Sequence, residues 1–152
     1  MTRTTRATAA LVAALLLPGL GHAQEVRSCD QDFQPDSIVE PWDQNSATFA
    51  NGDIRVAVLD TIEPAAAAFQ LLVLSPPRDE VGGRQCHIIG HDSGNGFGSV
   101  YFDKRTTSYD PTKGLTITVP VMPPGGGEEA TYLKITVNQS TGEIATSASH
   151  NP

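Results

Sequence analysis

The chain has 152 residues, with 17 acidic against 10 basic side chains and a formal net charge of −7. This length suits a single domain. The acidic excess repels polyanions at long range, which argues against nucleic acid and anionic membrane surfaces as partners.

Residues 1–23 have the pattern of a cleavable secretory signal of bacterial type. Arg3 and Arg6 precede an apolar run over residues 7–17, and Gly21-His22-Ala23 places small residues before the cut. The apolar run is too short for a membrane span, which needs roughly 20 residues. Removing 23 of the 152 residues leaves 129, and losing two arginines takes the net charge from −7 to −9. We expect a periplasmic or secreted mature chain with no membrane span.

Residues 24–46 lack a clear period and contain Pro35 and Pro41. We expect an irregular N-terminal arm, fixed to the body of the protein by Cys29 and by packing of Trp42. The only other cysteine is Cys86, and export to an oxidising compartment predicts a Cys29–Cys86 disulfide. The alternative is a free reactive thiol, which needs surroundings that lower the pKa of the cysteine.

From residue 47 the pattern becomes that of β-strands. Apolar residues alternate over 54–59, which predicts a strand with one buried face. A turn at Ala65-Ala66 precedes a continuous apolar run over 69–75, which indicates a strand buried on both faces. Further strands are predicted over 85–90 and 97–103.

The C-terminal part gives the clearest alternation. Residues 115–121 form one predicted strand, and Pro120, which has no backbone donor, indicates a sheet edge. Residues 133–137 and 143–146 are predicted to form a last hairpin, followed by a disordered tail over 148–152. The sequence therefore predicts one all-β domain over 47–147, a single antiparallel meander of about seven strands that forms a small barrel or sandwich.

The string His91-Asp92-Ser93 contains the three residue types of a hydrolase triad. Consecutive residues in a glycine-rich turn do not suit the geometry of a triad, in which the histidine lies between the other two. His87 and His91 would lie about 13 Å apart on one face of a strand, too far to share a zinc ion. We expect no catalytic residue, no metal and no cofactor.

Two further groups of residues bear on a binding site. The acids Asp53, Asp60 and Glu63 surround the strand predicted over 54–59, and we expect them to be solvated. We expect a second group to share the face of the sheet opposite the core, where it could form an aromatic patch that a partner or ligand covers; the alternative is a second core layer in a closed sandwich. These residues are His87, Ile89, Phe97, Tyr101 and Tyr132.

The stretches 60–66, 71–77 and 82–86 together resemble a group of small secreted bacterial proteins of unknown function, a resemblance that implies no activity. The sequence therefore predicts an exported, non-catalytic β domain that binds an envelope protein or a small ligand, through a sheet face or the Pro- and Gly-rich loop at 123–129. The alternatives are a small hydrolase using His91, Asp92 or Ser93, and a structural accessory subunit of an envelope complex. The oligomeric state is left open.

Overall fold

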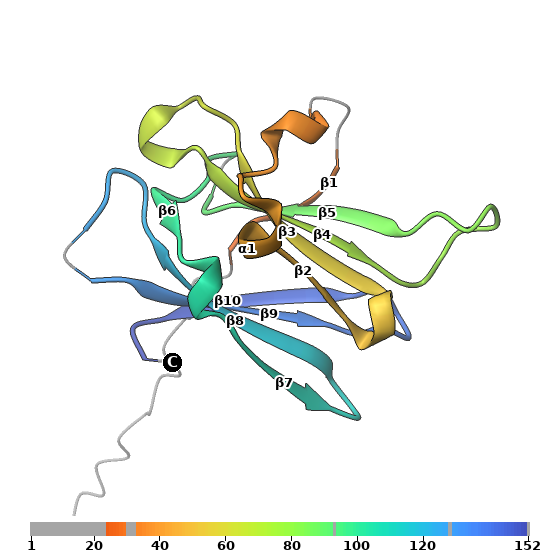
Figure 1. The fold of residues 1–152 in the computed structure, drawn as a ribbon. Helices are drawn as coiled ribbons and strands as arrows, with labels where there is room; N and C mark the ends of the chain where they lie inside the picture. Colours follow the sequence, from red (N-terminus) through yellow and green to blue (C-terminus); the bar gives the residue numbers. More distant parts are fainter. Residues whose placement is uncertain (1–23, 30–32, 93, 128, 152) are drawn as a thin grey trace, which may run out of the picture.

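The computed structural model describes residues 24–29, 33–92, 94–127 and 129–151. The predicted signal at 1–23 and Ser93 lie outside the described residues. The strands form two antiparallel sheets that lie one above the other (Figure 1). The protein is thus all-β, and its two layers form a sandwich. Within the described part of the chain, no helix is long and apolar enough to cross a membrane.

The first sheet contains the N-terminal five strands. Its order is β1-β5-β4-β3-β2, so β2 to β5 form a meander and β1 joins at the far edge beside β5. Asn51 and Gly52, both with positive φ, make the tight turn between β2 and β3. The strand bounds are β1 (Val26–Ser28), β2 (Ser46–Phe49), β3 (Ile54–Asp60), β4 (Phe69–Ser75) and β5 (Gln85–Ile89).

The second sheet contains the C-terminal five strands. Its order is β10-β9-β8-β6, and β7 also pairs with β8. The bounds are β6 (Ser99–Val100), β7 (Thr106–Asp110), β8 (Gly114–Met122), β9 (Thr131–Val137) and β10 (Ile144–Ser149).

Pro120 explains why β6 and β7 are separate strands. The carbonyl of Pro120 accepts a hydrogen bond from the N–H of Tyr101 at 2.9 Å, in the gap between β6 and β7. The backbone N and C=O of a residue in an antiparallel strand point to the same side. The missing donor of Pro120 therefore faces this gap, where the sheet edge is interrupted, as expected of a proline in a sheet.

The structure differs from the sequence prediction in the short elements. The described part of the chain forms ten strands where about seven were expected, and each sheet has its own meander. The strand expected over 97–103 is reduced to β6, because the chain turns into a 3₁₀ helix, η4 (Phe102–Lys104), that places Phe102 in the core. The segment 24–46 contains β1, and β10 extends to Ser149, into the expected tail.

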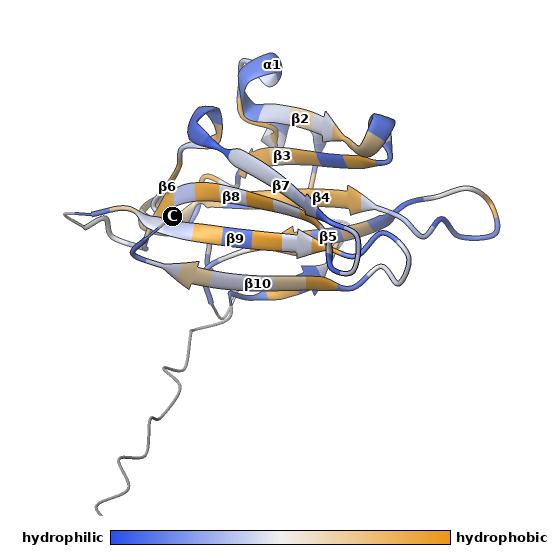
Figure 2. Ribbon diagram, turned by 90° about the horizontal axis from the view of Figure 1, so that it is seen from below, coloured by the Kyte–Doolittle hydropathy of each residue, from blue (hydrophilic) through white to orange (hydrophobic). Residues whose placement is uncertain are grey.

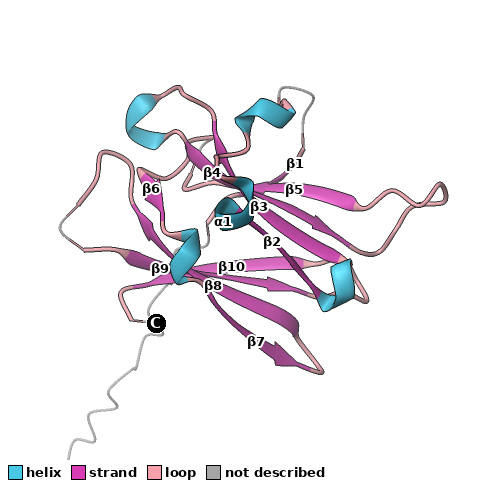
Figure 3. Cartoon of the chain, viewed as in Figure 1, coloured by secondary structure: helices cyan, strands magenta, loops and turns pink. Residues whose placement is uncertain are grey.

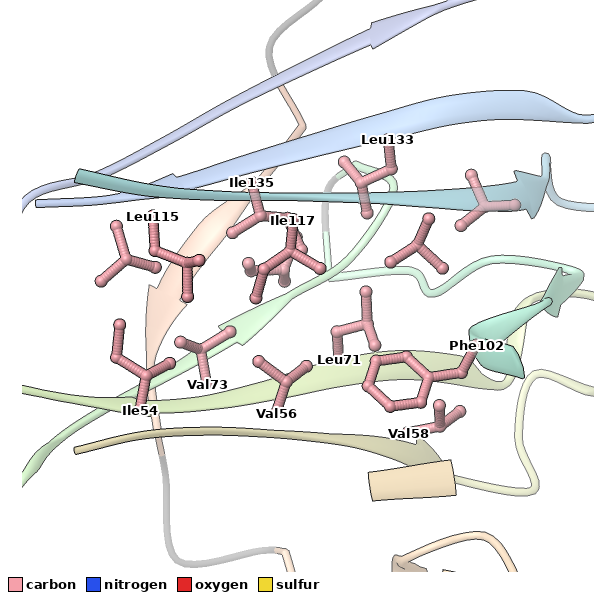
Figure 4. Close-up of a cluster of buried hydrophobic side chains, with 14 of the residues drawn as sticks. Ile54, Val56, Val58, Leu71, Val73, Phe102, Leu115, Ile117, Leu133 and Ile135 are labelled. Atoms are coloured by element: carbon pink, nitrogen blue, oxygen red, sulfur yellow. The ribbon is translucent and has the colours of Figure 1, made fainter. Parts of the chain in front are cut away.

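The core lies between the two sheets, where side chains from both inner faces meet (Figure 4). Phe102 enters it beside Val58, at the side where the edge of the second sheet is interrupted. Burying each large aliphatic or aromatic side chain contributes roughly 1.5–3 kcal/mol before entropy is counted. The cluster comprises Ile54, Val56, Val58, Leu71, Val73, Ile89, Phe97, Phe102, Leu115, Ile117, Val119, Val121, Leu133, Ile135 and Val137.

The outer face of the first sheet is also apolar. Ala57, Leu59 and Ile88 point away from the core by their register, yet each is at most 1% exposed. The prediction that residues 54–59 bury only one face is therefore wrong. The second side of β3 is buried because other parts of the chain cover this face of the sheet.

The arm between β1 and β2 runs from one edge of the first sheet to the other. At its start the N–H of Cys29 donates to the carbonyl of Cys86 at 3.1 Å, and further on the N–H of Val39 donates to Val58 at 2.9 Å. Its short helices are η1 (Pro35–Ser37) and α1 (Trp42–Asn45), drawn in cyan in Figure 3. Trp42 is 52% exposed, so it is not the apolar anchor that was expected.

Candidate ligand-binding site

A pocket of about 360 Å³ opens where the arm meets the outer face of the first sheet. We call it the outer-face pocket. It takes residues from β1, the arm, the end of β3 with the loop that follows it, and β4. The lining residues are Arg27, Phe33, Ser37, Asp60, Thr61, Ile62, Glu63 and Gln70.

Gln70 is the buried polar residue of this pocket. It is 5% exposed and stands opposite Leu59, on the outer face of the sheet. Its Oε1 accepts a hydrogen bond from Nη2 of Arg27 at 2.8 Å, and its Nε2 donates to the carbonyl of Gly94 at 3.5 Å. Buried polar groups are stable only when they are hydrogen-bonded. The Gln70 amide therefore holds the Arg27 guanidinium at a defined place.

Phe33 contacts the same guanidinium. The Cζ of Arg27 lies 5.2 Å from the centre of the Phe33 ring, a cation–π distance. At partly exposed sites such a contact contributes about 0.5–1 kcal/mol. Arg27 is thus oriented by an amide from β4 and by an aromatic ring from the arm.

The loop after β3 forms the opposite rim. The N–H of Ile62 donates to Oδ1 of Asp60 at 2.8 Å, and the Thr61 hydroxyl donates to the carbonyl of Ala68 at 2.9 Å. Ile62 has a φ of +68° and is 75% exposed. A β-branched residue in the left-handed region is a true outlier, with a cost of roughly 1–3 kcal/mol, and such strain gathers at functional sites.

The charges of the pocket are mixed. Arg27 supplies one cation, while Asp60 and Glu63 supply two carboxylates from the rim. These two acids were predicted to be solvated, and the structure places both in the lining of one pocket. A ligand with an anionic and a cationic group could meet a partner for each, with Phe33 and Ile62 available for apolar contact.

The five residues predicted as a ligand-facing patch do not share one surface. Ile89 and Phe97 are 0% and 1% exposed and belong to the core, as the alternative of a second core layer requires. Tyr132 stands opposite Pro120 on the outer face of the second sheet, whereas Tyr101 precedes η4. The prediction that these residues share one open face is therefore wrong. The second sheet covers the face of the first sheet that was expected to be open.

His87 belongs to the same group and lies on the inner face, opposite Val73. It is only partly buried, near the β1 edge of the sandwich. Burial lowers the pKa of His87 below its usual value, because desolvation disfavours the imidazolium. The folded state therefore favours the neutral imidazole of His87 over the imidazolium.

His91 and Asp92 lie in a tight turn. The N–H of His91 donates to the carbonyl of Asn95 at 2.9 Å, and the N–H of Asn95 donates to the carbonyl of Asp92 at 2.7 Å. Nδ1 of His91 is 3.3 Å from Oδ1 of its neighbour Asp92, and its ring meets the Phe97 ring edge-on at 6.0 Å. Ser93 lies outside the described residues. Among the residues that are described, no group of three or more His, Cys, Asp or Glu is placed to hold a metal ion.

The predicted disulfide is present. Cys29 and Cys86 are bonded, with their Cα atoms 5.4 Å apart. The bond joins the start of the arm to β5, two residues after Arg27. The sequence also predicted a binding segment in the loop that begins at Pro123. This loop is attached to the first-sheet side of the protein at Gly125, whose N–H donates to the carbonyl of Ala66 at 2.9 Å.

No protein-family model matches the chain, and neither a curated protein nor a solved structure matches it. The site therefore rests on its geometry. Sequence reasoning missed Arg27, Phe33, Ile62 and Gln70. One signal was present: Gln70 is the one strongly polar residue among the apolar side chains of 69–74. A polar side chain in a strand predicted to be buried on both faces needs a partner, and here that partner is Arg27.

Proposed function

We propose that the protein is exported to the periplasm or the medium with loss of residues 1–23, and that the mature domain binds a small zwitterionic ligand without chemical turnover. The leader pattern of residues 1–23 supports export. The Cys29–Cys86 disulfide supports it too, because structural disulfides persist in oxidising compartments.

The observation that carries the binding proposal is the Arg27–Gln70 pair at 2.8 Å in the outer-face pocket. Arginine is well suited to bind a carboxylate because its guanidinium offers two parallel donors. Asp60 and Glu63 across the pocket suit an ammonium group. The ligand class we propose is therefore a free amino acid or a comparably small molecule with both charges.

Binding without catalysis is proposed because the polar groups of the pocket have structural partners. Gln70 accepts from Arg27, Asp60 accepts from Ile62, and the Thr61 hydroxyl donates to Ala68. Groups held in this way orient a ligand. A nucleophile would instead need a neighbouring base.

Calorimetric titration with a panel of free amino acids tests this function. Each amino acid is paired with an amine that lacks the carboxylate and an acid that lacks the amine. We expect at least one zwitterion to bind, and each analogue with one charge to bind at least tenfold more weakly. Failure of every zwitterion to bind would overturn the proposal.

Arg27→Gln and Arg55→Gln form a matched pair of variants for the same titration. Arg27 lines the pocket, whereas Arg55 is an exposed arginine on β3 outside it. With thermal melting as a check on folding, we expect Arg27→Gln to abolish binding and Arg55→Gln to keep it. Equal binding by both variants would contradict the site.

A further inference from the structure

β7 is the most exposed strand of the sandwich. All five of its residues are exposed, which is true of no other strand in the described part of the chain. It lies at the outer edge of the second sheet (Figure 1), where it pairs with β8. Sheets usually protect such an edge with proline, lysine, a bulge or a very short strand. β7 contains no proline or lysine, and its single charge is Asp110 at the last position. We call the side of this strand that faces away from β8 the β7 edge.

The register shows which backbone groups lie along the β7 edge. Pro120 directs its backbone toward β6 and β7, and every second residue of an antiparallel strand does the same. Thr116, an even number of positions before Pro120, therefore exchanges its backbone hydrogen bonds with Ser108. The two neighbours of Ser108, Thr107 and Tyr109, direct their N–H and C=O groups away from β8. These groups are placed to bond a further strand.

Tyr109 is the large apolar side chain at this edge. It stands opposite Leu115 of the core, on the inner face of the second sheet, and yet it is 65% exposed. The first sheet therefore does not extend far enough to cover Tyr109. Outward backbone groups beside an uncovered aromatic ring suit the addition of a strand, in which the main chain bonds and the side chains pack.

We propose that the β7 edge binds the β7 edge of a second copy of this chain, as an antiparallel dimer with its two-fold axis at Ser108. In this register Thr107 and Tyr109 of each copy exchange both backbone hydrogen bonds with Tyr109 and Thr107 of the other. The two Tyr109 rings are then diagonal neighbours at about 7–8 Å, within reach of aromatic side chains. The pairing uses the same edge of both copies, so assembly ends at two.

The charges around β7 favour the antiparallel direction. Lys104 and Arg105 precede the strand and Asp110 ends it. Antiparallel copies bring the Asp110 end of each strand to the Arg105 end of the other, whereas parallel copies would bring like charges together. The next charges outward, Asp103 and Lys113, are also opposite in sign. This dimer goes beyond ligand binding and does not depend on it, since the outer-face pocket belongs to the first sheet.

Cysteine cross-linking tests the register of the dimer. Residue 108 lies on the axis as a non-hydrogen-bonded pair, in which the Cα atoms are about 4.5 Å apart, a separation that a disulfide spans. Ser108→Cys should therefore give a covalent dimer under mild oxidation, with the linked residue identified by peptide mass spectrometry. Thr106→Cys is the matched control on the same face of the same strand, because its two copies would lie about 13 Å apart. Equal linking of both variants, or linking of neither, would overturn the proposal.

Sedimentation equilibrium up to millimolar concentration tests the association itself. A pair of five-residue strands buries less than the roughly 1,200 Å² of a standard interface, so we expect a weak monomer–dimer equilibrium. Tyr109→Lys places two like charges beside the axis and should raise the dissociation constant at least tenfold. Val81→Lys also replaces an exposed apolar residue with lysine, in the loop between β4 and β5, and should leave the dissociation constant unchanged.

A mixture of charge variants completes the test. Tyr109→Lys and Tyr109→Glu should each be monomeric, and their equimolar mixture should form the dimer again, because opposite charges then meet at the axis. Thermal melting checks that each variant is folded. A wild-type protein that stays monomeric at every concentration, or that forms larger assemblies, would overturn the proposal. Equal weakening by Tyr109→Lys and Val81→Lys would contradict the β7 edge as the interface.

Discussion

The two outer faces of the sandwich differ, although both sheets are antiparallel and similar in size. The outer face of the second sheet carries Thr116, Thr118 and Lys134, all partly exposed. That of the first sheet carries Leu59 and Ile88, both buried, and the arm runs beside it. The first sheet therefore has a covered outer face, whereas the second has a solvated one that also carries a pocket, of about 320 Å³, lined by Lys113, Thr136 and Ala145 among others.

The hydropathy of the strands shows the origin of this difference. Apolar and polar segments alternate along β8 and β9, as Figure 2 shows from the side of the second sheet, whereas β4 is apolar along most of its length. Alternation of apolar and polar residues suits a strand with one solvent-exposed face, and a continuous apolar run suits a strand that is buried on both faces. A sheet of the second kind needs a cover, and the outer-face pocket opens where the arm meets this covered face.

Removal of the disulfide should have the largest effect on this comparison, since the bond fixes the start of the arm. For a separation of 57 residues, the chain-entropy relation gives a loss of about 4 kcal/mol in the free energy of unfolding of the Cys29→Ser, Cys86→Ser double variant. Urea unfolding measures it, with reduced wild-type protein as the control. Unchanged stability would show that the arm is held without the bond.

Truncation of Leu59 tests whether the outer face of the first sheet behaves as a core. Leu59→Ala should lower the free energy of unfolding by about 3 kcal/mol, because a buried cavity is created. Lys134→Ala, on the outer face of the second sheet, should change it by about 0.5 kcal/mol or less. Equal losses in urea unfolding would remove the distinction between the two faces.

Ile62→Gly tests the strain at the pocket rim. Glycine adopts a φ of +68° without steric cost, so the variant should gain about 0.5–1 kcal/mol of stability after its greater unfolded-state freedom is subtracted. It should bind zwitterions more weakly, because the apolar side chain is lost. Val81→Gly is the control: Val81 is 93% exposed and has no positive φ, so glycine there should give no gain. A gain in both variants, measured by thermal melting, would contradict the strain argument.

The smallest effect is expected from protonation of His87. Its folded-state pKa is lowered by burial, so the unfolded chain binds more protons at low pH. The contribution of His87 to stability is constant well above pH 6.5, the usual pKa of a histidine, and falls as the pH drops below it. In urea unfolding at several pH values, His87→Gln should lose stability less steeply than the wild type on acidification. Parallel curves would show that His87 makes no such contribution.

The fold class and the disulfide could be predicted from the sequence, because alternation over 115–121 and 133–137 and the two cysteines are local signals. The break between β6 and β7 was harder to predict, since it depends on which strand lies beside Pro120. The patch prediction failed because the period of two gives the face of a residue and says nothing of what covers that face. The outer-face pocket was missed because Arg27 and Gln70 are 43 residues apart and meet only through the order of the strands.

Chemical-shift mapping by ¹H–¹⁵N NMR tests the central claim most directly, since it reports on both outer faces in one titration with the amino-acid panel. We predict saturable shifts of the Gln70 side-chain amide, the Arg27 Nε–H and the backbone N–H of Ile62, and no shifts at Thr116 or Thr136. Shifts confined to the second sheet, or none at saturating ligand, would contradict the account.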